Sequence, residues 1–198
     1  MNSLPLAWLL DFGLAGVAAM SLLEKFLPVL PSYFLFVLVG VMTVQNMDDL
    51  TWTVLATCSG SIAGALAWYA IGHLLGDTRC QRLVDRFGRF VFLKPALYRR
   101  LTAAYRRNQF LVTAIGQAVP TVRIYLALPA GILGLPLGPF LLATAIGTFA
   151  WNAPLVTIGY LLRGSGWDPG MAGIVVGLSM MGLELLLVLL FRHLRRLA

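Results

Sequence analysis

The chain has 198 residues, of which 59% are hydrophobic and only 12% are charged, and its formal net charge is +7. Ordinary globular domains contain about 45–50% apolar and about 25% charged residues, so a soluble domain of this size could not bury so many apolar side chains. Residues 50–76 and 124–162 lack Asp, Glu, Lys and Arg altogether. Because a membrane-crossing helix needs about 20 apolar residues, the composition predicts an all-α polytopic membrane protein and excludes a soluble enzyme, a nucleic-acid binder and a disordered tail.

The first part of the chain is predicted to hold two crossing helices, Leu6–Leu23 and Leu50–Leu75, with a broken apolar segment between them. This segment, residues 24–45, carries Pro28 and Pro31 near its start. Proline breaks a helix because it lacks a backbone donor. Small residues recur along the second crossing and just after it: Gly60, Gly64, Gly72 and Gly76. Small residues spaced four apart let helices pack closely in lipid.

Residues 79–108 have a different character, because nine of the 15 basic residues lie there and Asp85 is the only acidic one. Basic and apolar side chains recur on separate faces, which is typical of an amphipathic helix at a membrane surface. Basic loops stay on the cytoplasmic side. We therefore expect this segment and the arginine-containing C-terminus to be cytoplasmic. The segment either only fixes the topology or also gathers anionic lipid head groups, and RNA binding is much less favoured.

The following apolar segment, residues 109–130, is broken in its turn by Pro120 and Pro129, and crossings are predicted at Leu135–Leu162 and Pro169–Phe191. Since the basic segment before it and the crossing after it both start at the cytoplasmic side, residues 109–130 must enter the membrane and return.

The same counting makes residues 24–45 a hairpin that enters from the opposite side. Two opposed re-entrant hairpins and about four crossing helices predict an inverted repeat, with a substrate site where the broken segments meet.

Four ionisable residues lie in or against these apolar segments: Asp11, Glu24, Arg123 and Glu184. Such residues are costly in a bilayer and usually functional. Glu24 and Arg123 each belong to a broken hairpin, so they would face each other if the hairpin tips meet. A guanidinium offers a planar fork that suits a phosphate. The alternative is that Glu24 caps a helix end and Arg123 pairs with it structurally, and we favour structural roles for Asp11 and Glu184.

The remaining polar residues of the hairpins are less informative alone: Ser32, Tyr33, Gln117 and Thr121. Cys58 and Cys80 are expected to be free thiols, because 22 residues of continuous helix would separate them by about 33 Å. Two distant cysteines and two histidines make a metal site improbable. No nucleophile–base arrangement is evident, so we expect neither a cofactor nor enzymatic chemistry.

Three sequence blocks resemble the DedA family, whose domain is also called the VTT or SNARE-associated domain. The pattern G-S-x-x-G-x(4)-Y-x-x-G-x(3)-G is reproduced by Gly60-Ser61, Gly64, Tyr69, Gly72 and Gly76. The block R-x-h-P-x-x-R…AG…F…G…W, where h is any apolar residue, is similar to Gln117 to Arg123, Pro129-Ala130-Gly131, Phe140, Gly147 and Trp151. Glu24 with Pro28 and Pro31 is similar to the family's first hairpin, and the resemblance covers roughly residues 20–163.

The resemblance implies one transmembrane domain over residues 1–198 in the bacterial inner membrane. Family members are linked to flipping undecaprenyl phosphate or phospholipids, sometimes with dependence on the proton-motive force. By position, Glu24 matches the family's first hairpin acid and Arg123 its second hairpin arginine. Tyr33 stands where many members have a second acid, and Gln117 where many have another arginine. These two departures make a less charged head group, or downhill scrambling, more plausible for this chain.

The expected function is therefore a lipid translocase, either a flippase or a scramblase. Arg123, Gln117, Tyr33 and Thr121 would bind the head group, and Glu24 would act as a gate, a counter-ion or a proton carrier. Expected partners are membrane lipids, protons and a second copy of the chain in a homo-oligomer, with no nucleic acid. Two alternatives remain open, a carrier for a small inorganic anion and a structural membrane-homeostasis protein.

Overall fold

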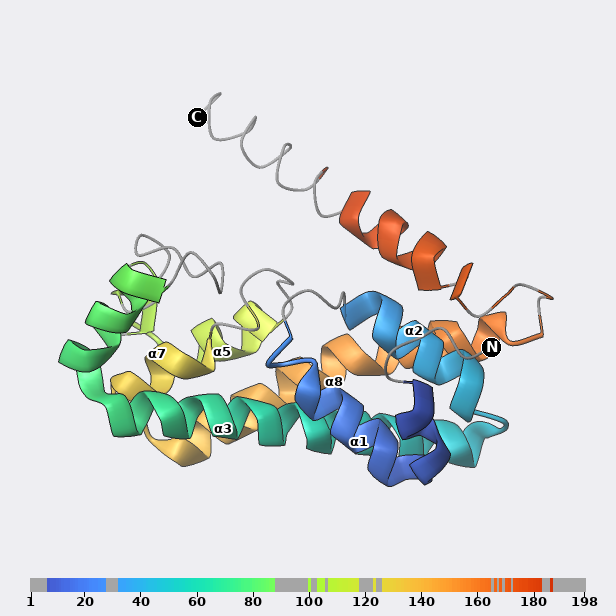
Figure 1. Ribbon diagram of the computed structural model, residues 1–198, viewed down its shortest axis with the longest axis horizontal. Helices are drawn as coiled ribbons and strands as arrows, with labels where there is room; N and C mark the ends of the chain where they lie inside the picture. The colour runs from blue at the N-terminus through green and yellow to red at the C-terminus, as the bar shows by residue number, and fades with distance from the viewer. Residues whose placement is uncertain are drawn as a thin grey trace.

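The computed structural model describes residues 7–27, 32–87, 100, 103–105, 107–117, 123, 126–164, 166, 168, 170–171, 173–182 and 186. The principal elements in these ranges are all helical (Figure 1): η1 (Ala7–Phe12), α1 (Gly13–Leu23), α2 (Ser32–Thr43), α3 (Met47–Phe87), α5 (Gln109–Gln117), α7 (Ala127–Ile132) and α8 (Leu137–Leu162). Two helices are long and apolar enough to cross a membrane, Met47–Leu75 within α3 and the whole of α8. The predicted all-α membrane class is confirmed.

Helix α3 begins with a reciprocal cap. The backbone N–H of Asp49 donates to the side chain of Asn46 at 2.9 Å, and the N–H of Gln45 donates to the carboxylate of Asp49 at 3.1 Å. This arrangement satisfies donors that the first turn of a helix leaves unpaired. No proline occurs between Met47 and Phe87, so α3 continues for 41 residues. The amphipathic segment predicted to start at residue 79 therefore begins inside α3, while residues 88–99 lie outside the described part.

Helix α8 matches the predicted crossing at Leu135–Leu162 to within two residues and contains Pro154 in its interior. Its start is held to α3, because the hydroxyl of Tyr69 donates to the carbonyl of Leu135 at 2.6 Å. Its other end is held to the segment after α2, since the guanidinium of Arg163 donates to the carbonyl of Val44. Together α3 and α8 form the long base of the fold (Figure 1).

The prediction of one crossing helix over residues 6–23 is wrong. Gly13 adopts a φ of 60°, a left-handed conformation that favours glycine, and it separates η1 from the 11-residue α1. At 1.5 Å per residue, α1 is about 16 Å long and cannot span a hydrocarbon core of about 30 Å.

Helix α1 packs mainly on α3 and meets α2 only at a small apolar cluster. Leu9, Met20 and Leu35 form one apolar cluster between them. The start of α1 and the end of α2 line a common pocket with Asp49, so both lie where α3 begins. The two helices therefore run in opposite directions. The predicted first hairpin, residues 24–45, includes the turn after α1 and the whole of α2, while its residues 28–31 lie outside the described part.

The segment predicted as the second hairpin also contains two short helices, α5 with nine residues and α7 with six. The hydroxyl of Tyr105 donates to the carbonyl of Leu126 at 2.9 Å and so fixes the start of α7. Burial raises the pKa of Tyr105 to about 12, which keeps this donor protonated. Pro129 lies in the first turn of α7, where its missing N–H costs no bond within the helix.

The helices pack in two matching sets. In the first half of the chain, α1 packs on the long helix α3, and in the second half α5 packs on the long helix α8. The helix that directly precedes each long helix packs on the other one: α2 packs on α8, and α7 packs on α3. This exchange of partners is the packing that an inverted repeat predicts.

Glycines lie at each of these contacts. A Cβ on Gly60 of α3 would lie 2.0 Å from the carbonyl oxygen of Ala18 in α1. A Cβ on Gly72 of α3 would lie 2.3 Å from that of Leu128 in α7. Gly64 faces the side chain of Lys25, and Gly76 lies further along α3. Gly60 and Gly72 let backbones approach more closely than any side chain would permit.

Candidate functional site

The two hairpin segments meet at a buried ion pair. Nη2 of Arg123 lies 3.4 Å from Oε1 of Glu24 and donates a 3.5 Å hydrogen bond to Oε2. Both side chains are fully enclosed by protein. Glu24 follows the last residue of α1, and Arg123 lies between α5 and α7, so residues 99 positions apart in sequence are joined at the core of the fold. The expected contact between these two charges is present in the structure, and their place at hairpin tips stays a prediction.

The ion pair with Glu24 uses only one nitrogen of the Arg123 guanidinium. A bidentate arginine–carboxylate pair uses two parallel bonds of about 2.7–2.9 Å, whereas here one nitrogen makes the contact at longer range. Nε and Nη1 of Arg123 are buried and have no hydrogen-bond partner among the described residues. Buried donors are normally satisfied. These two unused donors are therefore suited to an anionic ligand.

Aromatic rings flank the guanidinium on its faces. Its Cζ atom lies 5.3 Å from the ring centroid of Trp151 on α8 and 5.8 Å from that of Phe36 on α2. Such cation–π contacts stabilise a cation without occupying its N–H donors. Tyr33 at the start of α2 extends this arrangement, because its ring centroid lies 6.0 Å from that of Trp151. The rings orient Arg123 while its edge remains available.

Neutral polar side chains continue the site along α8. Asn152 is fully buried, and its side-chain amide donates to the hydroxyl of Ser61 on α3 at 3.3 Å. Thr144 and Thr148 lie on the same helical face at four-residue spacing, and both hydroxyls are buried without partners among the described residues. Sequence reasoning did not single out these α8 residues, because neutral polar residues carry no large cost in a crossing helix.

Gln117, at the end of α5, belongs to the same region. It is 1% exposed, and its Oε1 atom has no partner in the described part of the chain. Its side chain packs on Gly147, one turn of α8 before Trp151. An amide there could donate to a ligand oxygen without adding charge.

Lys25 is a further buried ion that sequence reasoning passed over. Its side chain is 2% exposed, it packs against Gly64 of α3, and its Nζ atom has no hydrogen-bond partner among the described residues. Trp68 holds the backbone in place, because its indole Nε1 donates to the carbonyl of Lys25 at 2.9 Å. Two basic side chains and one carboxylate, Arg123, Lys25 and Glu24, therefore share the centre of the fold.

Several predicted residues lie elsewhere or outside the described residues. Asp11 is exposed at the start of the fold, which fits a structural role. Cys58 is a buried free thiol in an apolar cluster with Val54 and Leu155, as expected. Outside the described residues lie Pro28, Pro31, Pro120, Thr121 and Glu184.

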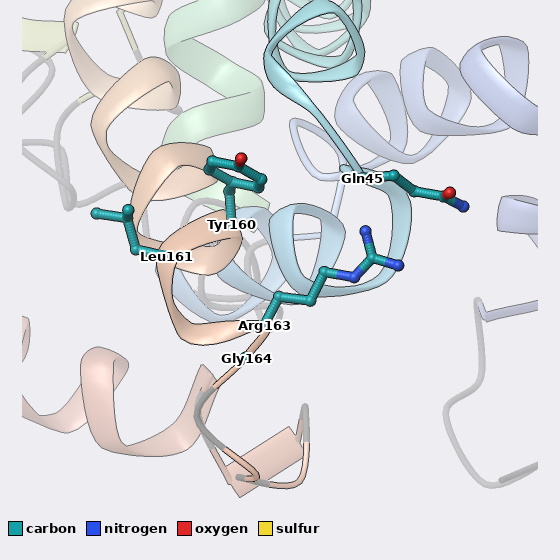
Figure 2. A pocket seen from close by; sticks show the side chains of 5 residues that line it. All are labelled: Gln45, Tyr160, Leu161, Arg163 and Gly164. Carbon is teal, nitrogen blue, oxygen red and sulfur yellow. The ribbon is translucent and has the colours of Figure 1, made fainter.

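A separate pocket of about 590 Å³ lies at the far end of α8 and is lined by Gln45, Tyr160, Leu161, Arg163 and Gly164 (Figure 2). Arg163 is twelve residues beyond Trp151, which is about 18 Å along a helix. Its guanidinium already donates to the carbonyl of Val44. This pocket is therefore distinct from the buried Arg123 centre, and none of its described lining residues has a buried donor without a partner.

Comparison with known proteins places the chain in a family. The VTT domain matches residues 16–161. An alkaline phosphatase-like protein of Lactococcus lactis subsp. cremoris is 32% identical over 166 residues, which cover 83% of this chain and 77% of that protein. Undecaprenyl phosphate transporter A of Staphylococcus aureus is 30% identical over 155 residues, covering 78% of this chain and 76% of that protein.

The protein of the same name in Bacillus subtilis is 24% identical over 163 residues, covering 82% of this chain and 78% of the relative. No solved structure gives a significant match. The domain match extends over most of the chain and includes both hairpin segments and both long helices. The chain therefore belongs to the VTT domain family, the DedA family of membrane proteins.

Proposed function

We propose that this protein is a lipid translocase, a flippase or scramblase that moves a phosphate-bearing lipid across the bacterial inner membrane. The lipid phosphate would bind between the hairpin tips at Arg123, while the acyl or prenyl chain stays in the bilayer. No covalent step is required. Undecaprenyl phosphate and glycerophospholipids are the two substrate classes considered.

The buried, half-used guanidinium of Arg123 is the observation that carries this proposal. A charge at the bilayer centre costs about 2.5–3.5 kcal/mol on insertion scales. Glu24 offsets only part of that cost, since it contacts one nitrogen at 3.4–3.5 Å. The free Nε and Nη1 donors lie on different edges of the guanidinium, and each would gain a charge-assisted hydrogen bond from a phosphate oxygen.

The neighbouring polar residues have supporting roles. Gln117 and Tyr33 would donate to the remaining phosphate oxygens, and Thr121 would assist from the second hairpin. Glu24 would act as the counter-ion when the site is empty and as the gate, with a proton replacing Arg123 as its partner when a phosphate binds. Glu24→Gln should then impair transport less at low pH, where a protonated glutamate resembles glutamine.

The relatives support a lipid phosphate as the ligand. Two of them are named undecaprenyl phosphate transporter A, and each aligns over more than three quarters of this chain. Their alignments and the domain match make a transport role more plausible than a purely structural one. The cytoplasmic location of residues 79–107 and of the C-terminus remains part of the proposal.

Transport is tested with purified protein in vesicles that contain no other protein. Fluorescent head-group analogues are placed in one leaflet, and their chemical accessibility from outside is followed over time. The proposal expects protein-dependent loss of accessibility for at least one phosphate-bearing lipid. A protein that moves inorganic phosphate but no lipid would contradict it in favour of an anion carrier, and release of inorganic phosphate from the lipid would indicate hydrolysis instead.

A further inference from the structure

The turn that follows α1 places two oppositely charged side chains side by side in the protein interior. Glu24 is 0% exposed and Lys25 is 2% exposed. Lys25 interacts electrostatically both with Glu24 and with Arg123, so the ammonium lies within the field of the central ion pair. Among the described residues, nothing accepts a hydrogen bond from its Nζ atom.

A position of this kind is unusual for lysine. Its flexible stem normally carries the ammonium out to water, and a buried ammonium without a partner is strongly unfavourable. Here the stem is held instead, because Gly64 leaves room for it on α3 and Trp68 fixes the backbone carbonyl. The fold therefore keeps a second cation inside, close to a guanidinium with two unused donors.

Two basic side chains share this centre with one carboxylate, Glu24, which already contacts Arg123. An anion that touched both Lys25 and Arg123 would favour the charged form of Lys25 and satisfy the free donors of both side chains. A head group that also carries an amine would bring a further positive charge beside Lys25 and would be repelled.

We propose that Lys25 is a second substrate-binding residue and that, with Arg123, it selects lipids whose head group is a net anion. This inference rests on the proposed lipid transport and specifies its substrate class. Lipid phosphomonoesters and anionic phosphodiesters are accepted, and zwitterionic phosphodiesters are disfavoured. The first hairpin then contributes to specificity through Lys25, and the second hairpin contributes through Arg123.

The test compares three fluorescent lipids in vesicles of one neutral background: phosphatidic acid, phosphatidylglycerol and phosphatidylethanolamine. The parent protein should move the two anionic lipids faster than phosphatidylethanolamine. Lys25→Met keeps the length of the stem but removes the charge. It should lower transport of the anionic lipids about tenfold or more, the loss expected when a charged hydrogen bond disappears, and should change phosphatidylethanolamine transport much less.

Lys25→Arg should keep the preference for anionic lipids, since it retains the cation. Arg163→Met is the matched control, because it removes an equal charge from an exposed position outside the basic segment and away from Arg123, and it should leave the preference unchanged. All variants are checked for monodispersity, and Lys25→Gln serves as a second neutral variant if Lys25→Met is unstable.

Equal transport of all three lipids by the parent would overturn the role of Lys25 without touching lipid transport itself. So would a Lys25→Met variant that is monodisperse and keeps the parent's preference, or one that slows all three lipids by the same factor. If the parent moves no lipid at all, the proposed function fails instead.

Discussion

The contact between α2 and α8 gives a sharp test of the packing, because it is made through glycines on both helices. A Cβ on Gly40 would lie 2.2 Å from the carbonyl oxygen of Val156. Ordinary van der Waals contact begins at 3.4 Å, so Gly40→Ala forces the helices apart by about 1.2 Å. Overpacking of this kind typically costs about 1–3 kcal/mol, partly offset by up to about 1 kcal/mol from the better helix propensity of alanine.

Gly138→Ala is a control that measures the gain in helix propensity without any added steric strain. Gly138 lies in the first turn of α8, and nothing lies within 4 Å of an added Cβ. The Gly40 variant should therefore be less stable than the Gly138 variant by about 1–3 kcal/mol, which corresponds to a melting temperature lower by about 2–12 °C for a chain of this size. Thermal unfolding of the purified protein in detergent measures both variants.

The reciprocal site sharpens the test. A Cβ on Gly159 would lie 2.2 Å from the carbonyl oxygen of Val37, so it strains the same interface. Once the helices have separated for one methyl group, the second costs less, and the double variant should lose less stability than the two single losses combined. A Gly40→Ala protein as stable as the Gly138→Ala control would refute the close contact of α2 with α8.

Three further outcomes are expected. Single cysteines at residues 102 and 198, in a background without other cysteines, should react with a membrane-impermeant reagent from the same side of the membrane. Labelling from opposite sides would overturn the predicted cytoplasmic location of the basic segment and the C-terminus. The double variant Cys58→Ala, Cys80→Ala should transport lipid at the parent rate, and a clear loss at normal expression would reveal a role for a thiol. Tyr69→Phe removes the 2.6 Å hydrogen bond to the carbonyl of Leu135 and should therefore lower the free energy of unfolding by about 0.5–1.5 kcal/mol. Thermal unfolding measures this loss, and unchanged stability would show that the bond does not hold the start of α8 in place.

The central pair was predictable from sequence because charges are expensive in apolar surroundings. Glu24 and Arg123 each sit beside prolines in otherwise apolar segments, so few explanations other than a mutual contact were available. The α8 crossing was equally clear, since 39 residues without Asp, Glu, Lys or Arg leave little choice.

The inward position of Lys25 and the break at Gly13 could not be predicted from the sequence, because both depend on the surrounding structure. Lys25 directly follows a carboxylate at the end of an apolar stretch, a position where lysine usually reaches out to the membrane surface. Only the three-dimensional contact with Gly64 and the bond from Trp68 show that it points inward. Gly13 gave no sign that it would divide the first apolar run, because an isolated glycine is tolerated in many helices.

Continuation of α3 to Phe87 was also missed. The arginines that begin at residue 79 suggested a separate surface element, but helical hydrogen bonding needs only the absence of a breaker, and no proline intervenes. Likewise, α1 packs on α3 and α2 packs on α8 through long-range contacts, which no local pattern encodes.

The most direct measurement of the central claim compares Arg123→Lys with Arg123→Ala in the reconstituted flipping assay. Lysine keeps the charge but offers only a point donor, whereas a phosphate held by the guanidinium edge needs the planar fork. If Arg123 is the head-group ligand, Arg123→Lys should be monodisperse yet lose most transport, and Arg123→Ala should lose all of it. If both variants are monodisperse and move lipid at the parent rate, Arg123 does not bind the head group and the proposed mechanism is wrong.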